Sequence, residues 1–130
     1  MKKVLALVIL ASLMTSAAPP TKIPPTFAMD SCTDLDGNLV CDTIGVFTFS
    51  GDNYSTKKDY LIYVTSGTFI GSEITPTVDS NGHMTATGFG VSFAGAWTFT
   101  IWSVRHNGAG IEALGSETVD FADYVPPPQP

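Results

Sequence analysis

The feature that most constrains this chain is a two-residue period of apolar and polar side chains. Residues 97–104 read Trp-Thr-Phe-Thr-Ile-Trp-Ser-Val, which places Trp97, Phe99 and Ile101 on one face of a strand and Trp102 on the other. Glycine and β-branched residues recur through the middle of the chain, and good helix formers never accumulate over three turns. The sequence therefore predicts an all-β fold.

Further strand-like segments are separated by turn sequences such as Ser-Gly-Asp-Asn at 50–53 and Asp-Ser-Asn-Gly at 79–82. We expect about seven or eight strands. They cover residues 27–30, 43–49, 60–65, 68–70, 74–78, 83–89, 97–104 and 118–121. A strand such as 60–64 is apolar on both faces, so one sheet could not bury it. We therefore expect two packed antiparallel sheets, a β-sandwich.

The two ends of the chain differ in composition from the middle. Eight of the nine prolines lie at positions 19, 20, 24, 25, 126, 127, 128 and 130, whereas all twelve glycines lie between Gly37 and Gly115. We expect one folded domain at residues 27–125, preceded by a Pro-rich segment at 18–26 and followed by a tail at 126–130. These flanks are either stiff polyproline segments or frayed termini.

Residues 1–17 have the features of a secretory signal peptide. A Lys pair precedes an apolar run over 4–13, and Thr15 and Ala17 supply small residues for cleavage. The run is well short of the roughly 20 residues needed to span a bilayer, so we expect a secreted or periplasmic protein without a membrane span. A formal net charge of −6 argues against a nucleic-acid partner.

The two cysteines flank a strong turn signal. Cys32 and Cys41 enclose Asp36-Gly37, a dipeptide typical of type I′ hairpin turns. Folding the chain there brings the cysteines opposite each other in a non-hydrogen-bonded pair, where a cross-strand disulfide fits. Export favours the bond. We predict a disulfide that pins an edge hairpin rather than joining the two sheets, with no redox role.

Four oxygen-bearing side chains in the same segment resemble the start of a calcium loop of the Asp-x-Asp-x-Asn type. They are Asp34, Asp36, Asn38 and Asp42. The resemblance then fails, because Leu39 stands where the turn glycine belongs and Gly45 where the bidentate Glu belongs. We prefer a solvated hairpin tip, with calcium as the alternative, and expect no other cofactor.

We predict no catalytic residues, because His83 and His106 lie in no established catalytic motif. Trp102 gives a sharper functional signal, since strand alternation places it on an outer face. With Tyr63 and Tyr60 nearby, it could stack on a sugar ring or anchor a protein partner. The other interpretation is that Trp102 packs under a loop or under the Pro-rich tail.

Several segments resemble bacterial immunoglobulin-like domains of surface and secreted proteins, and the ending, 107–119, resembles the last hairpin of fibronectin type III modules. The segments are 47–54 (FTFSGDNY), 60–64 (YLIYV), 77–86 (TVDSNGHMTA) and 94–101 (AGAWTFTI). The resemblance, over about residues 43–121, implies an immunoglobulin-like sandwich. Its implied role is extracellular adhesion, structural assembly or protein binding, with protein or glycan partners at the cell surface or self-association through the Pro-rich ends. The alternative is a carbohydrate-binding module that uses Trp102.

Overall fold

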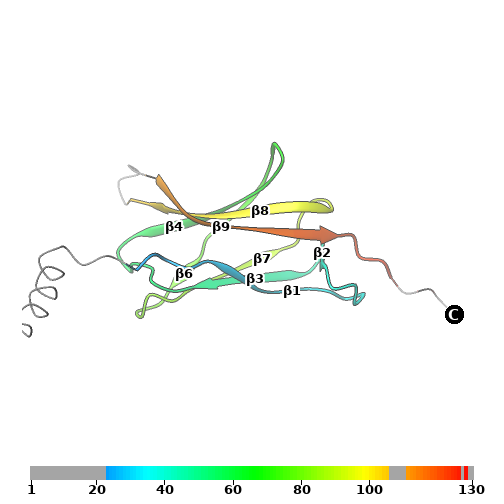
Figure 1. The fold of residues 1–130 in the computed structure, drawn as a ribbon, viewed down its shortest axis with the longest axis horizontal. Coiled ribbons are helices and arrows are strands. Elements are labelled where there is room, and N and C mark those ends of the chain that lie inside the picture. The colour runs from blue at the N-terminus through cyan, green and yellow to red at the C-terminus, as the bar shows by residue number, and fades with distance from the viewer. Residues whose placement is uncertain (1–22, 106–110, 127, 129–130) are drawn as a thin grey trace, which may run out of the picture.

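The computed structural model describes residues 23–105, 111–126 and 128. The expected signal peptide and His106 lie outside these residues. Within them, nine strands form two sheets that pack face to face, with the orders β1-β3-β7-β6 and β2-β9-β8-β4-β5 (Figure 1). The predicted all-β sandwich is confirmed. No helix in the described part is long and apolar enough to cross a membrane. The strands are β1 (Ala28–Cys32), β2 (Cys41–Asp42), β3 (Val46–Gly51), β4 (Asp59–Ser66), β5 (Phe69–Ile74), β6 (Thr77–Val78), β7 (Met84–Phe89), β8 (Gly95–Val104) and β9 (Ile111–Ala122).

The core lies between the sheets and is built on the alternation of β8. Trp97, Phe99 and Ile101 point inward and are each at most 1% exposed, as the period predicts. Phe99 meets two rings of the opposite sheet, with centroids 5.1 Å from Phe47 and 4.8 Å from Phe49. Each such buried side chain contributes about 1.5–3 kcal/mol, so this aromatic layer is a main source of stability.

Hydrogen bonds at Thr26 hold the N-terminal segment to the sandwich. The Thr26 N–H donates to the Asp52 carbonyl at 3.1 Å, and the Tyr54 hydroxyl donates to the Thr26 carbonyl at 2.7 Å. A Cβ at Gly51 would overlap that same carbonyl, so the close approach requires glycine there. Burial raises the pKa of Tyr54 to about 12.

Cys32 and Cys41 form the predicted disulfide, with their Cα atoms 5.5 Å apart. The predicted edge hairpin is wrong. β1 pairs with β3 in one sheet, whereas β2 pairs in parallel with β9 in the other. The disulfide therefore joins the two sheets, at the point where the chain crosses from one to the other.

The turn around Asp34 explains why no hairpin forms. The Asp34 carboxylate accepts the N–H groups of Asn38 and Leu39, at 3.1 and 2.9 Å. These bonds fold the loop around a side chain instead of building a ladder, an alternative that Asp offers the backbone. The chain then runs along β9, and the Asp42 N–H to Thr33 carbonyl bond of 2.8 Å is the one backbone bond recorded between the two arms.

Strand lengths also differ from expectation, with a consequence for the surface. β9 extends over twelve residues, whereas the predicted segment 74–78 divides between the end of β5 and the two-residue β6. β6 pairs with β7 only at Thr77–Thr85 and Val78–Met84. The remainder of β7, residues 86–89, therefore has β3 as its one recorded partner strand.

Candidate functional site

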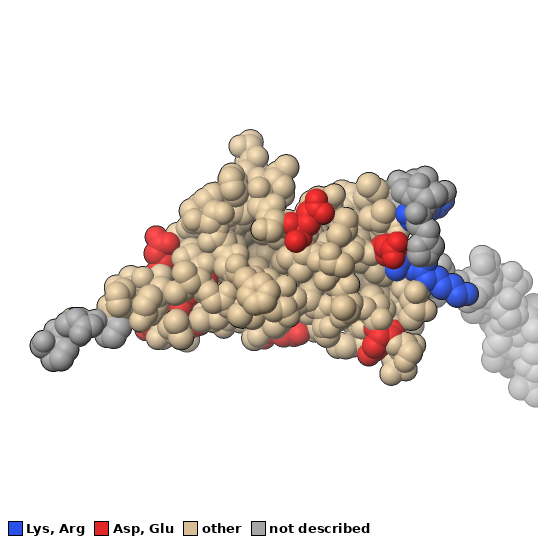
Figure 2. Space-filling model, turned by 180° about the vertical axis from the view of Figure 1, so that it is seen from behind, with Lys and Arg blue, Asp and Glu red and all other residues tan. Residues whose placement is uncertain are grey.

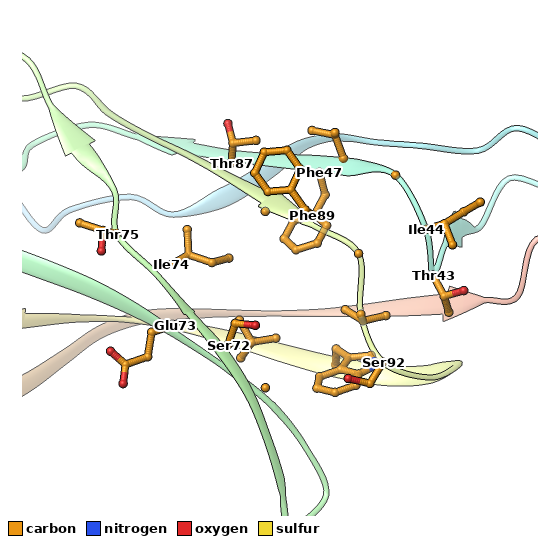
Figure 3. Close-up of a pocket in the computed structure, with 18 residues that line it drawn as sticks. Thr43, Ile44, Phe47, Ser72, Glu73, Ile74, Thr75, Thr87, Phe89 and Ser92 are labelled. Carbon is orange, nitrogen blue, oxygen red and sulfur yellow. The ribbon is translucent and has the colours of Figure 1, made fainter.

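A groove of about 830 Å³ opens between the two sheets along the side formed by β5 and β7. Its walls come from these two strands, from the start of β3 and from the segments before β3 and after β7 (Figure 3). The space-filling view in Figure 2 shows this side hollowed beneath the projecting β4–β5 hairpin. A second pocket, lined by Lys58, Ser103, Arg105, Ile111 and Glu112, is smaller, at about 390 Å³.

Both sheets present a backbone edge beside the groove. β5 pairs with β4 on one side and has no strand on the other within the described residues. Residues 86–89 of β7 are likewise paired on the β3 side alone. Edges of this kind offer rows of N–H and C=O groups to which a further strand can pair.

The lining of the groove is mainly apolar, with hydroxyl groups around it. Phe47, Ile74 and Trp97 form apolar walls, and Glu73 is the one charged side chain among the described lining residues. Phe89 lies at the rim of the groove, on the outward face of β7 (Figure 3), and is 79% exposed. A large exposed apolar side chain at such a place is typical of an interaction surface.

Two glycines let aromatic rings lie directly against the strands at the groove. A Cβ added to Gly88 would overlap the Phe47 ring and lie 3.0 Å from Ile74 Cδ1. A Cβ added to Gly71 would lie 3.2 Å from Trp97 Cζ3. Because both positions lack side chains, the rings occupy that space and the groove above them stays open.

An aromatic cluster continues the apolar surface from the groove toward the β4–β5 hairpin. The ring of Phe93 lies 4.8 Å from that of Trp97 and 5.3 Å from that of Phe69. The Trp97 indole N–H donates to the Phe93 carbonyl at 2.8 Å, which fixes the loop before β8. Phe69 and Phe93 both remain exposed. Sequence reasoning did not find this cluster or the groove.

The outer face of the second sheet carries two of the three aromatic residues proposed for binding. Trp102 is half-buried, and its ring meets that of Tyr63 edge-on at 6.2 Å. The expectation for Tyr60 is wrong, because Tyr60 is 7% exposed, packs on Tyr54 and accepts the Ser55 N–H at 2.9 Å. Residues three apart on a strand face opposite sides, so Tyr60 and Tyr63 cannot share a surface.

Paired hydroxyl groups extend this outer face away from Trp102. Thr98 bonds to Thr118 at 2.9 Å, and Thr100 bonds to Ser116 at the same distance. The hydroxyl pairs satisfy each other across β8 and β9. They give the face a polar, uncharged surface beside its two aromatic rings.

Three of the four expected metal ligands come together at the opposite end of the sandwich from β6. Asp34, Asp36 and Asp42 each offer a carboxylate oxygen, and these oxygens lie within 4.8 Å of one another. The Asn38 Oδ1 accepts the Val40 N–H at 3.0 Å and so helps to shape the turn. The clustering comes from the loop and β2, and not from the hairpin tip that the sequence suggested.

The charges in this acidic cluster (Asp34, Asp36 and Asp42) are held close by backbone donors. The Val125 N–H donates to Asp36 Oδ2 at 3.1 Å and lowers the pKa of Asp36. The Leu35 N–H donates to Asp42 Oδ2 at 2.7 Å. Two like charges 4.8 Å apart repel by about 1 kcal/mol in water and by about 3 kcal/mol at an effective dielectric constant of 20.

His83 forms an exposed ion pair with Asp52, its Nδ1 lying 2.9 Å from Asp52 Oδ1. This bond raises the pKa of His83. The pair ties the β6–β7 turn to the segment after β3. Asp79 accepts the N–H groups of Asn81 and His83, which builds the turn itself and lowers the pKa of Asp79.

The fold and its surfaces define a disulfide-linked two-sheet β-sandwich with an apolar groove along one open side. No protein-family model, curated protein or solved structure matches the chain.

Proposed function

We propose that this protein is a secreted immunoglobulin-like module that binds another protein and carries out no catalysis. The groove takes an extended, apolar segment of the partner, which adds as a strand to an open sheet edge. Such an interaction serves extracellular adhesion or the assembly of a surface structure.

The strand order supports the immunoglobulin-like part of this proposal. β1, β3, β7 and β6 follow the order of strands A, B, E and D of that fold, and β9, β8 and β4 follow the order G, F and C. β5 then takes the position that variable-type domains add beside strand C. The disulfide departs from the antibody pattern, because it joins β1 to β2 and not β3 to β8.

The disulfide also supports export, since such bonds persist in oxidising compartments. The apolar run at 4–13 fits the same interpretation.

The observation that carries the proposal is the combination of an apolar groove with two unpaired edges. In strand addition, backbone hydrogen bonds supply affinity and pockets for alternate side chains supply specificity. Here β5 and residues 86–89 of β7 offer the backbone groups, and the walls around Phe47 and Ile74 offer the pocket. The low charge of the groove favours an apolar segment.

A phage-displayed library of random linear peptides, selected on the full chain, tests this proposal. We expect enriched peptides with alternating apolar residues, and slower amide hydrogen exchange in β5 and at residues 86–89 when such a peptide is bound. Phe89→Glu should abolish peptide binding. Ile111→Glu is the matched control, because Ile111 is also an exposed apolar residue but lies on β9, away from the groove.

Peptides that bind the Phe89→Glu variant as tightly as the unchanged protein would contradict the proposal. So would protection of amides on β9 alone. Sedimentation velocity of the chain, with and without residues 126–130, separates a second route: self-association that depends on the Pro-rich tail would place the assembly surface there instead of at the groove.

Glycan binding at Trp102 and Tyr63 is a second candidate, favoured by their adjacency beside the hydroxyl pairs of the outer face. Aromatic rings of this kind stack on sugar rings. Glycan-array binding that Trp102→Ala removes and Phe89→Glu retains would favour this function. A loss of stability without a glycan ligand would instead identify Trp102 as a packing residue.

A further inference from the structure

We infer that Asp34, Asp36 and Asp42 form a calcium site at the place where the disulfide joins the two sheets. The three carboxylates converge on one volume, with an oxygen of each within 4.8 Å of the others. This site is separate from the groove, and its residues do not line it.

The buried state of Asp42 points to a ligand beyond the cluster itself. Asp42 is 2% exposed, and its Oδ1 has no hydrogen-bond partner within the described structure. Asp36 Oδ1 is likewise enclosed and unpartnered. A buried carboxylate oxygen without a donor is costly. Two such oxygens beside a third carboxylate form an arrangement that a bound cation satisfies.

No side-chain cation of the described chain serves this purpose. Among the described residues, the Lys and Arg side chains are Lys57, Lys58 and Arg105. In Figure 2 they lie at the end of the molecule opposite to β2 and the C-terminal segment. The one ion pair recorded in the described part joins His83 to Asp52.

The donor set favours calcium over other divalent metals. Carboxylate oxygens are hard ligands, which suit Ca²⁺ and Mg²⁺, and both cysteines are held in the disulfide and cannot supply thiolates for zinc. Mg²⁺ requires near-ideal octahedral geometry, whereas Ca²⁺ accepts six to eight oxygens in flexible arrangements. An irregular loop suits the larger ion.

The position of the site gives the ion a structural consequence. Asp34 and Asp36 lie in the loop that leaves β1, Asp42 lies on β2, and Asp36 also holds the Val125 N–H of the C-terminal segment. One ion would therefore tie together both sheets and the segment that leaves the domain. We expect calcium to order the start of the Pro-rich tail.

Isothermal titration calorimetry of the full chain with CaCl₂ tests the site directly. We expect one calcium per chain with a dissociation constant of about 10⁻⁴ to 10⁻³ M, the range of extracellular modules, and weaker binding of MgCl₂. Asp36→Asn and Asp42→Asn should each weaken calcium binding by about tenfold or more. Asp120→Asn is the matched control, because Asp120 is exposed on β9 outside the cluster.

Two readouts keep the test decisive if Asp42→Asn unfolds. Asp36 is only partly buried, so Asp36→Asn retains the fold and carries the comparison alone. In the unchanged protein, calcium should also shift the Val125 amide resonance. Absence of calcium binding at millimolar concentration, or equal affinity in Asp36→Asn and Asp120→Asn, would overturn the inference. Phe89→Glu should retain calcium binding, so failure of the groove proposal leaves this result unaffected.

Discussion

Reduction of the Cys32–Cys41 disulfide offers the sharpest test of how the two sheets are held together. The bond links β1 of one sheet to β2 of the other. In a hairpin, the same bond would duplicate a local turn that already persists in the unfolded chain. The disulfide instead closes a loop that has no strand ladder. The whole entropy that the disulfide removes from the unfolded chain should therefore appear in the free energy of unfolding.

The magnitude follows from the length of the closed loop. The cysteines are separated by 9 positions, and loop-closure entropy for a ring of about ten residues contributes about 2.6 kcal/mol at 25 °C. For a domain of about 100 residues, a loss of that size lowers the melting temperature by about 10–20 °C.

Urea unfolding of the oxidised and reduced forms of the unchanged protein measures this loss without creating a cavity. We expect a lower midpoint and reversible unfolding in the reduced form. The Cys32→Ala/Cys41→Ala double variant should agree with the reduced protein apart from the small effect of the removed sulfur atoms. A difference below about 0.5 kcal/mol between oxidised and reduced protein would refute the loop argument.

Three further predictions concern single side chains. Gly88→Ala should destabilise the fold by about 1–3 kcal/mol, measured by urea unfolding, because the new Cβ overlaps the Phe47 ring. Asp52→Asn should return the raised pKa of His83 toward 6.5, measured by NMR titration. In the unchanged protein, the contribution of His83 to the free energy of unfolding is full below pH 6.5 and is lost as the pH rises through the raised pKa. Tyr54, whose pKa is raised to about 12, should make stability fall between about pH 10 and 12, and Tyr54→Phe should flatten that fall in pH-dependent melting curves.

Much of the sandwich follows from side-chain period, because the period reports burial directly. The inward face of β8 was predicted residue by residue, since Trp97, Phe99 and Ile101 alternate with threonines. The disulfide was also predicted, but its place in the fold was not. Asp36-Gly37 carries a hairpin signal, yet the Asp34 carboxylate outcompetes the ladder by accepting two N–H groups of the turn.

The groove could not be predicted from the local sequence pattern, because it depends on which strand edges are left without a pairing strand. β6 is two residues long, and this leaves the end of β7 with an open edge. One local signal did exist. Phe89 follows Thr85 and Thr87 on the outward face of its strand, and a large apolar residue among threonines indicates a contact surface.

The two sheets are linked differently on the two sides of the sandwich, and this difference bears on the role of the groove. On the β1 side, the disulfide joins the sheets, and Glu117 of β9 accepts the Met29 N–H of β1 at 3.1 Å. A side chain thus occupies part of the edge that β1 leaves unpaired. On the β5 side, no hydrogen bond between β5 and β7 is recorded within the described residues, and Phe89 remains exposed.

An open edge beside apolar side chains promotes unwanted association, and proteins commonly protect such edges with charges, proline or a covering segment. β5 carries Glu73 as its one charged residue. Replacing Ser72 by Lys would add a second charged side chain to the edge strand β5 beside the groove, without removing an apolar side chain. If the edge serves a partner strand, Ser72→Lys should reduce binding of the selected peptides and leave the melting temperature unchanged. Equal peptide binding would show that the partner segment does not reach β5.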